Sequence, residues 1–231
     1  MHFFYSTDIK DDSIMLDGQE MIHCIKVLRK KNNDFIYVTN GNGNLFKCKI
    51  IDSSSNQSKL SIVSKKTNKR NIKTHLLIAP TKNHKRIEWM VEKTVEIGID
   101  RITFLICKNS IRRTVNLDRL NKIALSAMKQ TMSTFLPQMD ECTIFDKAIT
   151  SIDSKEKYVA HLQDHKIQFL PKLIRNETSR CILIGPEGDF DKNEIDYSLT
   201  HGFVEVSLGS SRLRTETAGI VSMTMLNSGN E

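Results

Sequence analysis

Two glycine loops near the end of the chain are the stretches best suited to bind a ligand. The apolar run 182–184 stops at residues 185–188 (Gly-Pro-Glu-Gly), and the run 203–208 stops at Gly209, so each loop follows a predicted strand. Glycine has no side chain, and a ligand can therefore approach the backbone closely. We expect the two loops to lie side by side at one edge of an α/β sheet, where such sheets bind their ligands.

The loops lack the sequence patterns of the common nucleotide sites. There is no G-x-G-x-x-G fingerprint in the chain, and no Gly-Lys-Ser or Gly-Lys-Thr follows either loop. A dinucleotide held by a Rossmann fingerprint and a phosphate held by a P-loop are thereby excluded. The loops therefore bind a different kind of ligand, or, as the alternative, they are plain turns without a binding function.

Helices are predicted to follow both loops. Asp191 and Glu194 have the spacing of a capping box, which marks a helix start, and a second helix begins within 212–218. Upstream, apolar runs alternate with amphipathic helical segments, which predicts βα units on a parallel sheet. The upstream strands are expected at 75–80, 102–107, 143–145 and 158–162.

Two amphipathic helices are expected to cover that sheet. One spans 84–97 and ends at Gly98, and Asn116 can cap the next. The inward face of the first is predicted to contain Ile87, Met90, Val91, Thr94 and Val95. The inward face of the second is predicted to contain Leu117, Leu120, Ala124, Met128 and Thr131.

The last helix is apolar on almost every side. This composition predicts burial nearly all round, either in a subunit interface or in the core of the domain. Its apolar residues are Ile220, Val221, Met223, Met225 and Leu226.

Residues 1–70 form a separate β-rich block. Short apolar runs alternate with turns, Asn-Gly-Asn-Gly at 40–43 predicts a hairpin, and 23–29 is the one helix-like insert. The runs predicted as strands are 35–38, 45–51 and 60–63. We expect a small β-barrel, followed after a polar, basic boundary at 65–71 by a second domain over 71–231.

Positive charge is concentrated in the first third of the chain and at this boundary. The chain has 34 Lys and Arg against 27 Asp and Glu, a net charge of +7. Through residue 72 there are 12 Lys and Arg against 7 Asp and Glu, with a local peak at Arg29, Lys30 and Lys31. Residues 65–86 contain eight cations and no acidic residue. Clustered cations favour contact with nucleic-acid phosphates, and a solvated face is the alternative.

Composition also indicates the compartment. The five cysteines include no C-x-x-C pair and mostly lie in apolar runs, so we expect buried, unreactive thiols and no metal site. No apolar run approaches the ~20 residues of a membrane span, and no signal peptide is recognised. We expect a soluble, cytoplasmic protein.

The motifs at 184–188 (Ile-Gly-Pro-Glu-Gly), 208–209 (Leu-Gly) and 213–218 (Leu-Arg-Thr-Glu-Thr-Ala) resemble the RsmE family of SPOUT-class 16S rRNA (uracil-N3)-methyltransferases. The similarity covers essentially the whole chain. It implies a PUA-like RNA-binding β-barrel over 1–70 and a SPOUT α/β domain over 71–231 with a C-terminal trefoil knot. It also implies a homodimer that uses S-adenosyl-L-methionine and acts on 16S rRNA within the small ribosomal subunit.

The resemblance assigns roles to individual residues. S-adenosyl-L-methionine is expected to contact Leu162, Ile184, Gly185, Glu187, Gly188, Leu208, Gly209 and Leu213. Apart from the resemblance, the clustered positive charge makes Arg29, Lys30, Lys31, Lys82, Lys85 and Arg86 candidates for RNA contact, and His23, Arg112 and Arg113 are further candidates. During methylation at N3 of uracil a proton leaves and negative charge spreads over two carbonyl oxygens. Arg214 is the candidate to stabilise that charge, and Glu216 is the candidate to take the proton.

Each of these assignments has an alternative. Arg214 can instead form a structural pair with Glu216 or Glu187, and Glu216 can instead cap its helix. A methyltransferase of the same class can act on another RNA position, such as a ribose 2′-oxygen or a guanine. A non-catalytic RNA-binding ribosome-assembly factor is the third possibility, and the intact glycine loops argue against it. Measurement of S-adenosyl-L-methionine binding separates the enzyme from the assembly factor.

Overall fold

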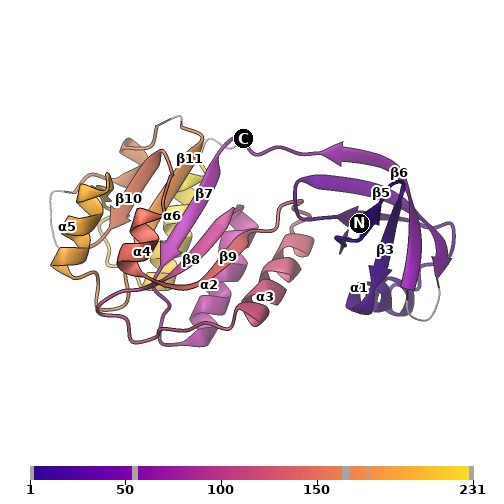
Figure 1. Cartoon of the computed structure of the whole chain (residues 1–231), viewed down its shortest axis with the longest axis horizontal. Coiled ribbons are helices and arrows are strands. Elements are labelled where there is room, and N and C mark those ends of the chain that lie inside the picture. Colours follow the sequence, from indigo (N-terminus) through magenta and orange to yellow (C-terminus); the bar gives the residue numbers. More distant parts are fainter. Residues whose placement is uncertain (1–2, 54–56, 163–166, 176, 229–231) are drawn as a thin grey trace. The chain divides into compact units, whose positions relative to one another are not determined.

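The chain folds into two compact units (Figure 1), each described here by itself. The computed structural model describes residues 3–53, 57–162, 167–175 and 177–228. Unit 1 comprises Met1–Lys69 and Met128–Leu136, and unit 2 comprises Arg70–Ala127 and Pro137–Glu231.

The segment 128–136 belongs to unit 1, whereas the sequence pattern assigned it to the second domain. Backbone hydrogen bonds explain the difference. The N–H of Leu136 donates to Gly41 O, and the N–H of Gly43 donates to Thr134 O, both at 2.8 Å. Such pairing between distant parts of the chain has no local sequence signal.

Unit 1 is built on a six-stranded sheet in the order β1-β4-β5-β6-β3-β2. Its strands are β1 (Phe3–Tyr5), β2 (Ile9–Lys10), β3 (Ser13–Asp17), β4 (Phe35–Thr39), β5 (Asn44–Ser53) and β6 (Gln57–Thr67). Neighbours pair antiparallel, except for the parallel pair β1 and β4. The predicted helical insert is confirmed as α1 (Gly18–Ile22) and the π-helix η1 (His23–Val27), which pack on the sheet's core.

The turn at 40–43 joins β4 to β5 as a hairpin, as predicted. Gly41 and Gly43 have φ angles of +77° and +85°, which glycine adopts without steric cost. The division between the two units falls between Lys69 and Arg70, within the predicted boundary at 65–71, and β6 continues into this segment as far as Thr67. Pairing with β5 extends this strand through residues whose side chains alone favour a loop.

Unit 2 contains a six-stranded, fully parallel sheet in the order β12-β10-β11-β7-β8-β9, which confirms the predicted α/β class. Its strands are β7 (Lys73–Ile78), β8 (Arg101–Ile106), β9 (Gln138–Ile144), β10 (Glu156–Ala160), β11 (Ser179–Ile184) and β12 (Val204–Val206). The helices are α2 (His84–Ile97), α3 (Leu117–Gln130, whose last three residues belong to unit 1), α4 (Phe145–Thr150), the 3-10 helix η2 (Leu170–Lys172), α5 (Lys192–Thr200) and α6 (Thr215–Leu226).

Helices cover both faces of this sheet (Figure 1). On one face, α4 and α5 pack over strand residues such as Leu105 and Leu183. On the other face, α6 lies close to β7 and to α2. A Cβ atom at Gly219 would lie 3.0 Å from Ile78 Cδ1, so the glycine permits this close approach.

The sequence predicted the inward face of α2 fully and that of α3 in part, since Leu117 is only half-buried. The five side chains predicted on the inward face of α2 are all buried, and Gly98 ends the helix with a φ of +106°. Asn116 caps α3 by accepting from the N–H of Arg119 at 3.0 Å. Thr131 is exposed, because α3 ends at Gln130, and the buried face contains Ala127 instead.

Two further expectations need correction. Phe145 was predicted to lie in a strand, but it is the first residue of α4, and its ring is buried against Phe190. Within the single chain the last helix is not buried all round, because Ile220, Val221 and Met225 are half-buried; this contradicts the core alternative and does not test the subunit-interface alternative. The small residues on its inner face allow tight packing there and leave the larger apolar ones toward the outside. The buried residues of α6 are Thr215, Glu216, Gly219, Ser222, Met223 and Leu226.

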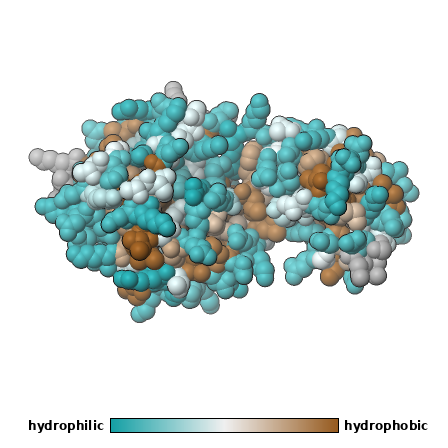
Figure 2. Space-filling model, in the orientation of Figure 1, coloured by the Kyte–Doolittle hydropathy of each residue, from teal (hydrophilic) through white to brown (hydrophobic). Residues whose placement is uncertain are grey.

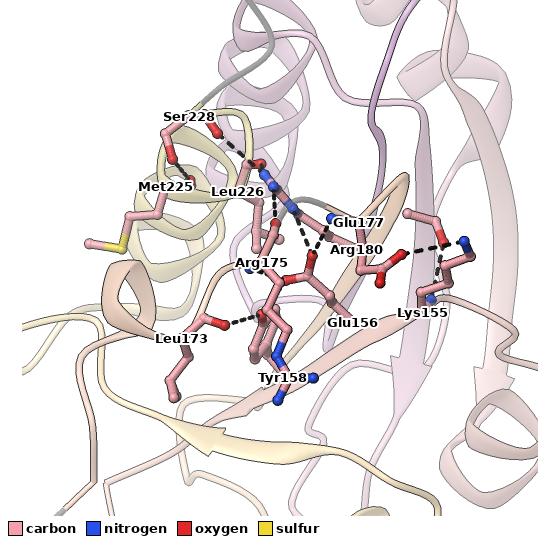
Figure 3. A network of polar contacts seen from close by, with 11 residues as sticks. Lys155, Glu156, Tyr158, Leu173, Arg175, Glu177, Arg180, Met225, Leu226 and Ser228 are labelled. Atoms are coloured by element: carbon pink, nitrogen blue, oxygen red, sulfur yellow. Dashed lines mark hydrogen bonds and ion pairs between the residues drawn. The ribbon is translucent and has the colours of Figure 1, made fainter.

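A buried polar network holds the C-terminal end of α6 (Figure 3). Arg180 of β11 is 2% exposed and donates to the backbone oxygens of Leu226 and Arg175, at 2.6 and 2.5 Å. Its charge is balanced by Glu156 of β10, 3.4 Å away. Glu156 also accepts from the hydroxyl of Tyr158. The network therefore ties the end of α6 to two strands of the sheet.

On the face shown in Figure 2, hydrophilic residues predominate and hydrophobic ones lie in scattered patches. None of the described helices is long and apolar enough to cross a membrane.

Candidate active site

A cavity of about 430 Å³ opens at the carboxyl ends of three parallel strands of unit 2. Its wall includes Ala160, His161 and Leu162 after β10, the loop after β11, the loop after β12 and the residues leading into α6. Since β10 lies between β11 and β12, the two glycine loops are not adjacent as predicted. They lie at the same sheet edge, separated by the end of β10, and the three strand ends together form the cavity.

Most of the residues predicted to bind the cofactor line this cavity. These are Leu162, Ile184, Gly185, Glu187, Leu208, Gly209 and Leu213. Gly188 is the exception: a Cβ atom there would face Asn109 at 3.4 Å. The side chain of Asn109 donates to the backbone oxygens of Gly188 and Asp189, at 3.3 and 3.1 Å. Gly188 therefore lies on the outer side of the loop.

The loop after β11 is fixed by bonds to neighbouring segments. Glu187 Oε1 accepts from the backbone N–H of Lys82 at 2.9 Å, and Asp189 Oδ2 accepts from the N–H of Leu162 at 2.9 Å. A Cβ atom at Gly185 would lie 3.1 Å from the backbone nitrogen of Phe190, so this position requires a minimal side chain. The cavity wall is thus preorganised rather than an open turn.

Arg214 and Glu216 enter the cavity wall at the start of α6. Glu216 is only 5% exposed. Its Oε1 lies 3.5 Å from Nε of Arg86, and its Oε2 is buried without a hydrogen-bond partner among the described residues. A buried acceptor without a partner is costly, and it indicates a donor that a ligand would bring.

The alternative of a structural pair for Arg214 finds no support. Glu216 pairs with Arg86 instead, and Glu187 bonds to the backbone of Lys82. Within the described part of the chain, the Arg214 side chain makes no ion pair and is exposed. Its guanidinium is therefore available to a ligand in the cavity.

Comparison with known proteins identifies the family. The model of the RNA methyltransferase domain matches residues 68–227, and the model of the RNA methyltransferase PUA domain matches residues 16–63. The chain belongs to the RNA methyltransferase family. Two curated relatives are named Ribosomal RNA small subunit methyltransferase E. The one from Buchnera aphidicola is 28% identical and covers 91% of this chain and 86% of its own, and the one from Mesomycoplasma hyopneumoniae is 27% identical and covers 97% and 98%.

Solved structures agree with this membership. A probable rRNA-methyltransferase from Porphyromonas gingivalis is 32% identical to this methyltransferase and aligns with a TM-score of 0.91, over 100% of this chain and 98% of the other. The Neisseria gonorrhoeae small subunit methyltransferase E, solved with S-adenosyl methionine bound, has the same fold at 21% identity. Its TM-score is 0.86, over 99% and 97% of the two chains. The resemblance to the RsmE family is thereby confirmed.

The basic residues predicted to bind RNA lie at different places in this methyltransferase and differ in how exposed they are. Lys82 and Lys85 line a groove of about 750 Å³ at the start of α2, together with His84 and Arg119. Arg86 instead lines the cavity at the strand ends. In unit 1, Arg29 and Lys31 are exposed, whereas His23 and Lys30 are half-buried. The two remaining candidates, Arg112 and Arg113, lie in unit 2.

The two neighbouring arginines differ in how far their guanidinium groups are already bonded. Arg112 donates to the backbone oxygens of Thr81 and Lys82, at 3.1 Å from Nε and 2.7 Å from Nη2. It therefore supports the loop before α2. Arg113 is exposed and lines a separate cavity beside Asn116 and Cys142.

The cysteines of the methyltransferase are unpaired, and all but the half-buried Cys142 are buried. Burial raises the pKa of Cys24 to about 11 and that of Cys48 to about 12, so these thiols are protonated at neutral pH. In the described part of the chain, no cluster of His, Cys, Asp and Glu could hold a metal ion.

Sequence reasoning missed the pairing of Arg86 with Glu216 and the bond between Lys82 and Glu187. Lys82 bonds to the loop after β11, 105 residues later, and Arg86 pairs with the first turn of α6, still further along the chain, so neither contact has a local sequence signal. The one available signal was the polar run between β7 and α2, which places Lys82 and Arg86 near the carboxyl edge of a parallel strand.

Proposed function

We propose that this methyltransferase transfers a methyl group from S-adenosyl-L-methionine to N3 of a uridine in 16S rRNA. The observation that carries the proposal is the buried Glu216 Oε2, unpaired among the described residues, in a cavity that Arg214 also lines. An acceptor and a cation that line one cavity, both without a partner among the described residues, suit a substrate that loses a proton and becomes an anion. The names of the curated relatives support ribosomal RNA of the small subunit as the substrate.

The cavity fits the cofactor in size and in the character of its wall. A volume of about 430 Å³ lies within the roughly 300–1,000 Å³ typical of small-molecule sites. The nucleoside would be held by the strand-end loops, in particular by Leu162, Gly185, Leu208, Gly209 and Leu213. When bound, S-adenosyl-L-methionine supplies a methyl group on a sulfonium, which is electrophilic without activation by the protein.

The chain's own side chains supply the rest of the chemistry. Uracil N3 is an imide nitrogen between two carbonyl groups, and it becomes nucleophilic when its proton leaves. Glu216 Oε2 accepts that proton. Arg214 donates hydrogen bonds to a carbonyl oxygen on which the negative charge develops. Because a guanidinium stays protonated, Arg214 stabilises the anion without exchanging a proton with it.

RNA reaches this cavity along basic surfaces. Lys82 and Lys85 are exposed in the groove at the start of α2, within four residues of Arg86 at the cavity wall. Unit 1 acts as the PUA-like RNA-binding barrel, with Arg29 and Lys31 exposed for phosphate contacts. The target uracil must be unstacked to enter the cavity, so a single-stranded or flipped nucleotide is the substrate.

We also propose that the protein is a homodimer, that its C-terminal part forms a SPOUT-type trefoil knot, and that it acts in the cytoplasm. Half-buried Ile220, Val221 and Met225 on α6 and the 46%-exposed Trp89 on α2 support an apolar contact with a second subunit. Since α2 and α6 pack together, these residues can form one surface.

Calorimetry with S-adenosyl-L-methionine and mass mapping of 16S rRNA from a deletion strain test this function. We expect tight cofactor binding, and loss of one N3-methyl group that the wild-type gene restores and a Glu216→Gln gene does not. Cofactor binding with a missing methyl group on a ribose or a guanine would favour action at another position. No cofactor binding and unchanged rRNA would favour an assembly factor.

A further inference from the structure

The Glu216 carboxylate has two oxygens in different situations. Oε1 is paired with Arg86, and Oε2 is buried at the cavity without a partner among the described residues. A carboxylate can rotate about its last side-chain bond, so a fixed partner on one oxygen decides where the other one points. The side chain is 6% exposed, which makes an unbalanced charge there unfavourable.

Arg86 is held in place by the first turn of α2 and the loop before it. The side chain of Asn83 caps the helix by accepting from the N–H of Lys85 at 2.9 Å. The loop is also fixed at Lys82, whose N–H donates to Glu187 and whose backbone oxygen accepts from Arg112. α2 packs directly on α6, which carries Glu216. The pair therefore links two helices that are already packed together.

We infer that Arg86 is a positioning residue for Glu216, rather than a phosphate contact as its sequence neighbours suggested. The pairing with Oε1 fixes the rotation of the carboxylate and with it the place of the buried Oε2 in the cavity wall, where Oε2 would take the proton that the substrate gives up. This inference rests on the proposed function for the role of Glu216. It assigns Arg86 a task separate from those of Lys82 and Lys85, which lie in the neighbouring groove.

The first test needs no ligand and measures whether the pair exists as a unit. Urea unfolding is compared for the wild type, Arg86→Gln, Glu216→Gln and the double variant. Arg86→Gln should lower the unfolding midpoint in the wild type, because it leaves a buried carboxylate without its cation. The same change should have little effect in the Glu216→Gln background. Equal effects in both backgrounds would overturn the pairing.

The second test measures the kinetic consequence on the same four proteins, with an unstructured rRNA fragment as substrate. Arg86→Gln should lower kcat roughly a hundred-fold, the scale of a misplaced catalytic group, with KM for RNA little changed. Arg86→Lys should recover part of the loss because it restores the charge. In the Glu216→Gln background, Arg86→Gln should add little, since the group it positions is already gone.

Lys85→Gln supplies the pattern of a phosphate contact for comparison: a higher KM and a weaker dependence of RNA affinity on salt. If Arg86→Gln gives that pattern in place of a kcat loss, or adds its full kcat loss to Glu216→Gln, the positioning role is wrong. If Glu216→Gln alone leaves kcat intact, the proposed role of Glu216 fails, and the positioning inference fails with it. In that case a coupled unfolding cycle would still identify Arg86–Glu216 as a structural pair.

Discussion

Nη1 of Arg180 donates to the backbone oxygen of Leu226 at 2.6 Å, and this bond joins the middle of the parallel sheet to the last turn of α6 (Figure 3). The last carbonyl groups of a helix have no partner within the helix, so a buried guanidinium is an effective cap. The first turn of the same helix carries Glu216 at the cavity. α6 is therefore held at one end by charge and presents its other end to the ligand.

Removal of this cap should destabilise unit 2 strongly. Arg180→Met leaves Glu156 buried without its cation, and we expect a loss of about 3–5 kcal/mol in the free energy of unfolding, measured in urea. Lys155→Ala is the matched control, because the Lys155–Glu177 pair lies nearby with side chains 60% and 44% exposed. Exposed pairs contribute about 0–1 kcal/mol, so equal losses in the two variants would contradict this account.

Gly209 should be required for cofactor binding. Its φ of +134° strains any other residue, and it lines the cavity, so Gly209→Val should abolish S-adenosyl-L-methionine binding in calorimetry. Gly202→Val is the control for backbone strain alone, because Gly202 has a φ of +81°, lacks close neighbours and does not line the cavity. Normal affinity in a folded Gly209→Val protein would remove this loop from the site.

The groove at the start of α2 should make RNA affinity sensitive to salt. Replacement of Lys82 and Lys85 by Gln should reduce the slope of log affinity against log salt by roughly 0.7 for each lysine that contacts a phosphate. Cofactor affinity should not change. Lys147→Gln with Lys192→Gln removes two exposed charges from other helices as a control. The same slope in both double variants would show that Lys82 and Lys85 are solvated surface residues that do not contact RNA phosphates.

Arg214 should act on the rate rather than on stability. Arg214→Ala removes a cation without a described partner, so the melting temperature should stay close to that of the wild type. Loss of one preorganised donor to an oxyanion costs about 2.7–4 kcal/mol, which is a hundred- to a thousand-fold decrease in kcat. Arg214→Lys should recover the rate only partly, because an ammonium cannot reproduce the planar fork. Single-turnover methylation that is unaffected in both variants would show that another group stabilises the anion.

His75 should make the stability of unit 2 depend on pH. Burial lowers its pKa from 6.5 to about 4, with Arg101 acting in the same direction and Asp140 opposing it. Between these two values the unfolded chain binds a proton that the native protein does not, so stability should fall as pH decreases through this window. The full loss is roughly 3 kcal/mol.

His75→Gln tests the source of this pH dependence. In the native protein Thr103 donates to Asp140, so the 2.8 Å bond between His75 and Thr103 requires a proton on Nε2. Glutamine can offer a similar N–H donor and does not titrate. Unfolding curves in urea between pH 7 and pH 4 should therefore be flatter for the variant, and parallel curves would assign the pH dependence to other groups.

Local patterns in the sequence were enough to predict individual elements. The capping box of Asp191 and Glu194 is present, with the N–H of Asp191 donating to Glu194 at 2.8 Å. The buried face of α2 and its end at Gly98 were predicted because a helix encodes its face and its end in a few neighbouring residues. The continuous apolar runs likewise indicated buried parallel strands.

What the sequence could not predict depends on contacts between distant segments. The order of strands in unit 2 inserts β10 between the two glycine loops, and no local spacing contains that information. For the same reason Arg86 looked like one cation of a basic run, although its partner is Glu216. The motifs identified the family and most of the cavity wall, and the geometry of the carboxylate required the folded chain.

The strand order of unit 2 also has a consequence for how the protein folds. β7 pairs with β11, about a hundred residues later in the chain. The chain must therefore close a very long loop to form the centre of the sheet, before the side chains of the hydrophobic core are buried. High contact order of this kind slows folding, and the cavity draws on segments from both sides of that closure. An early folding intermediate with β7, α2 and β8 alone would lack most of the cavity wall. We therefore expect S-adenosyl-L-methionine to stabilise only the fully closed sheet.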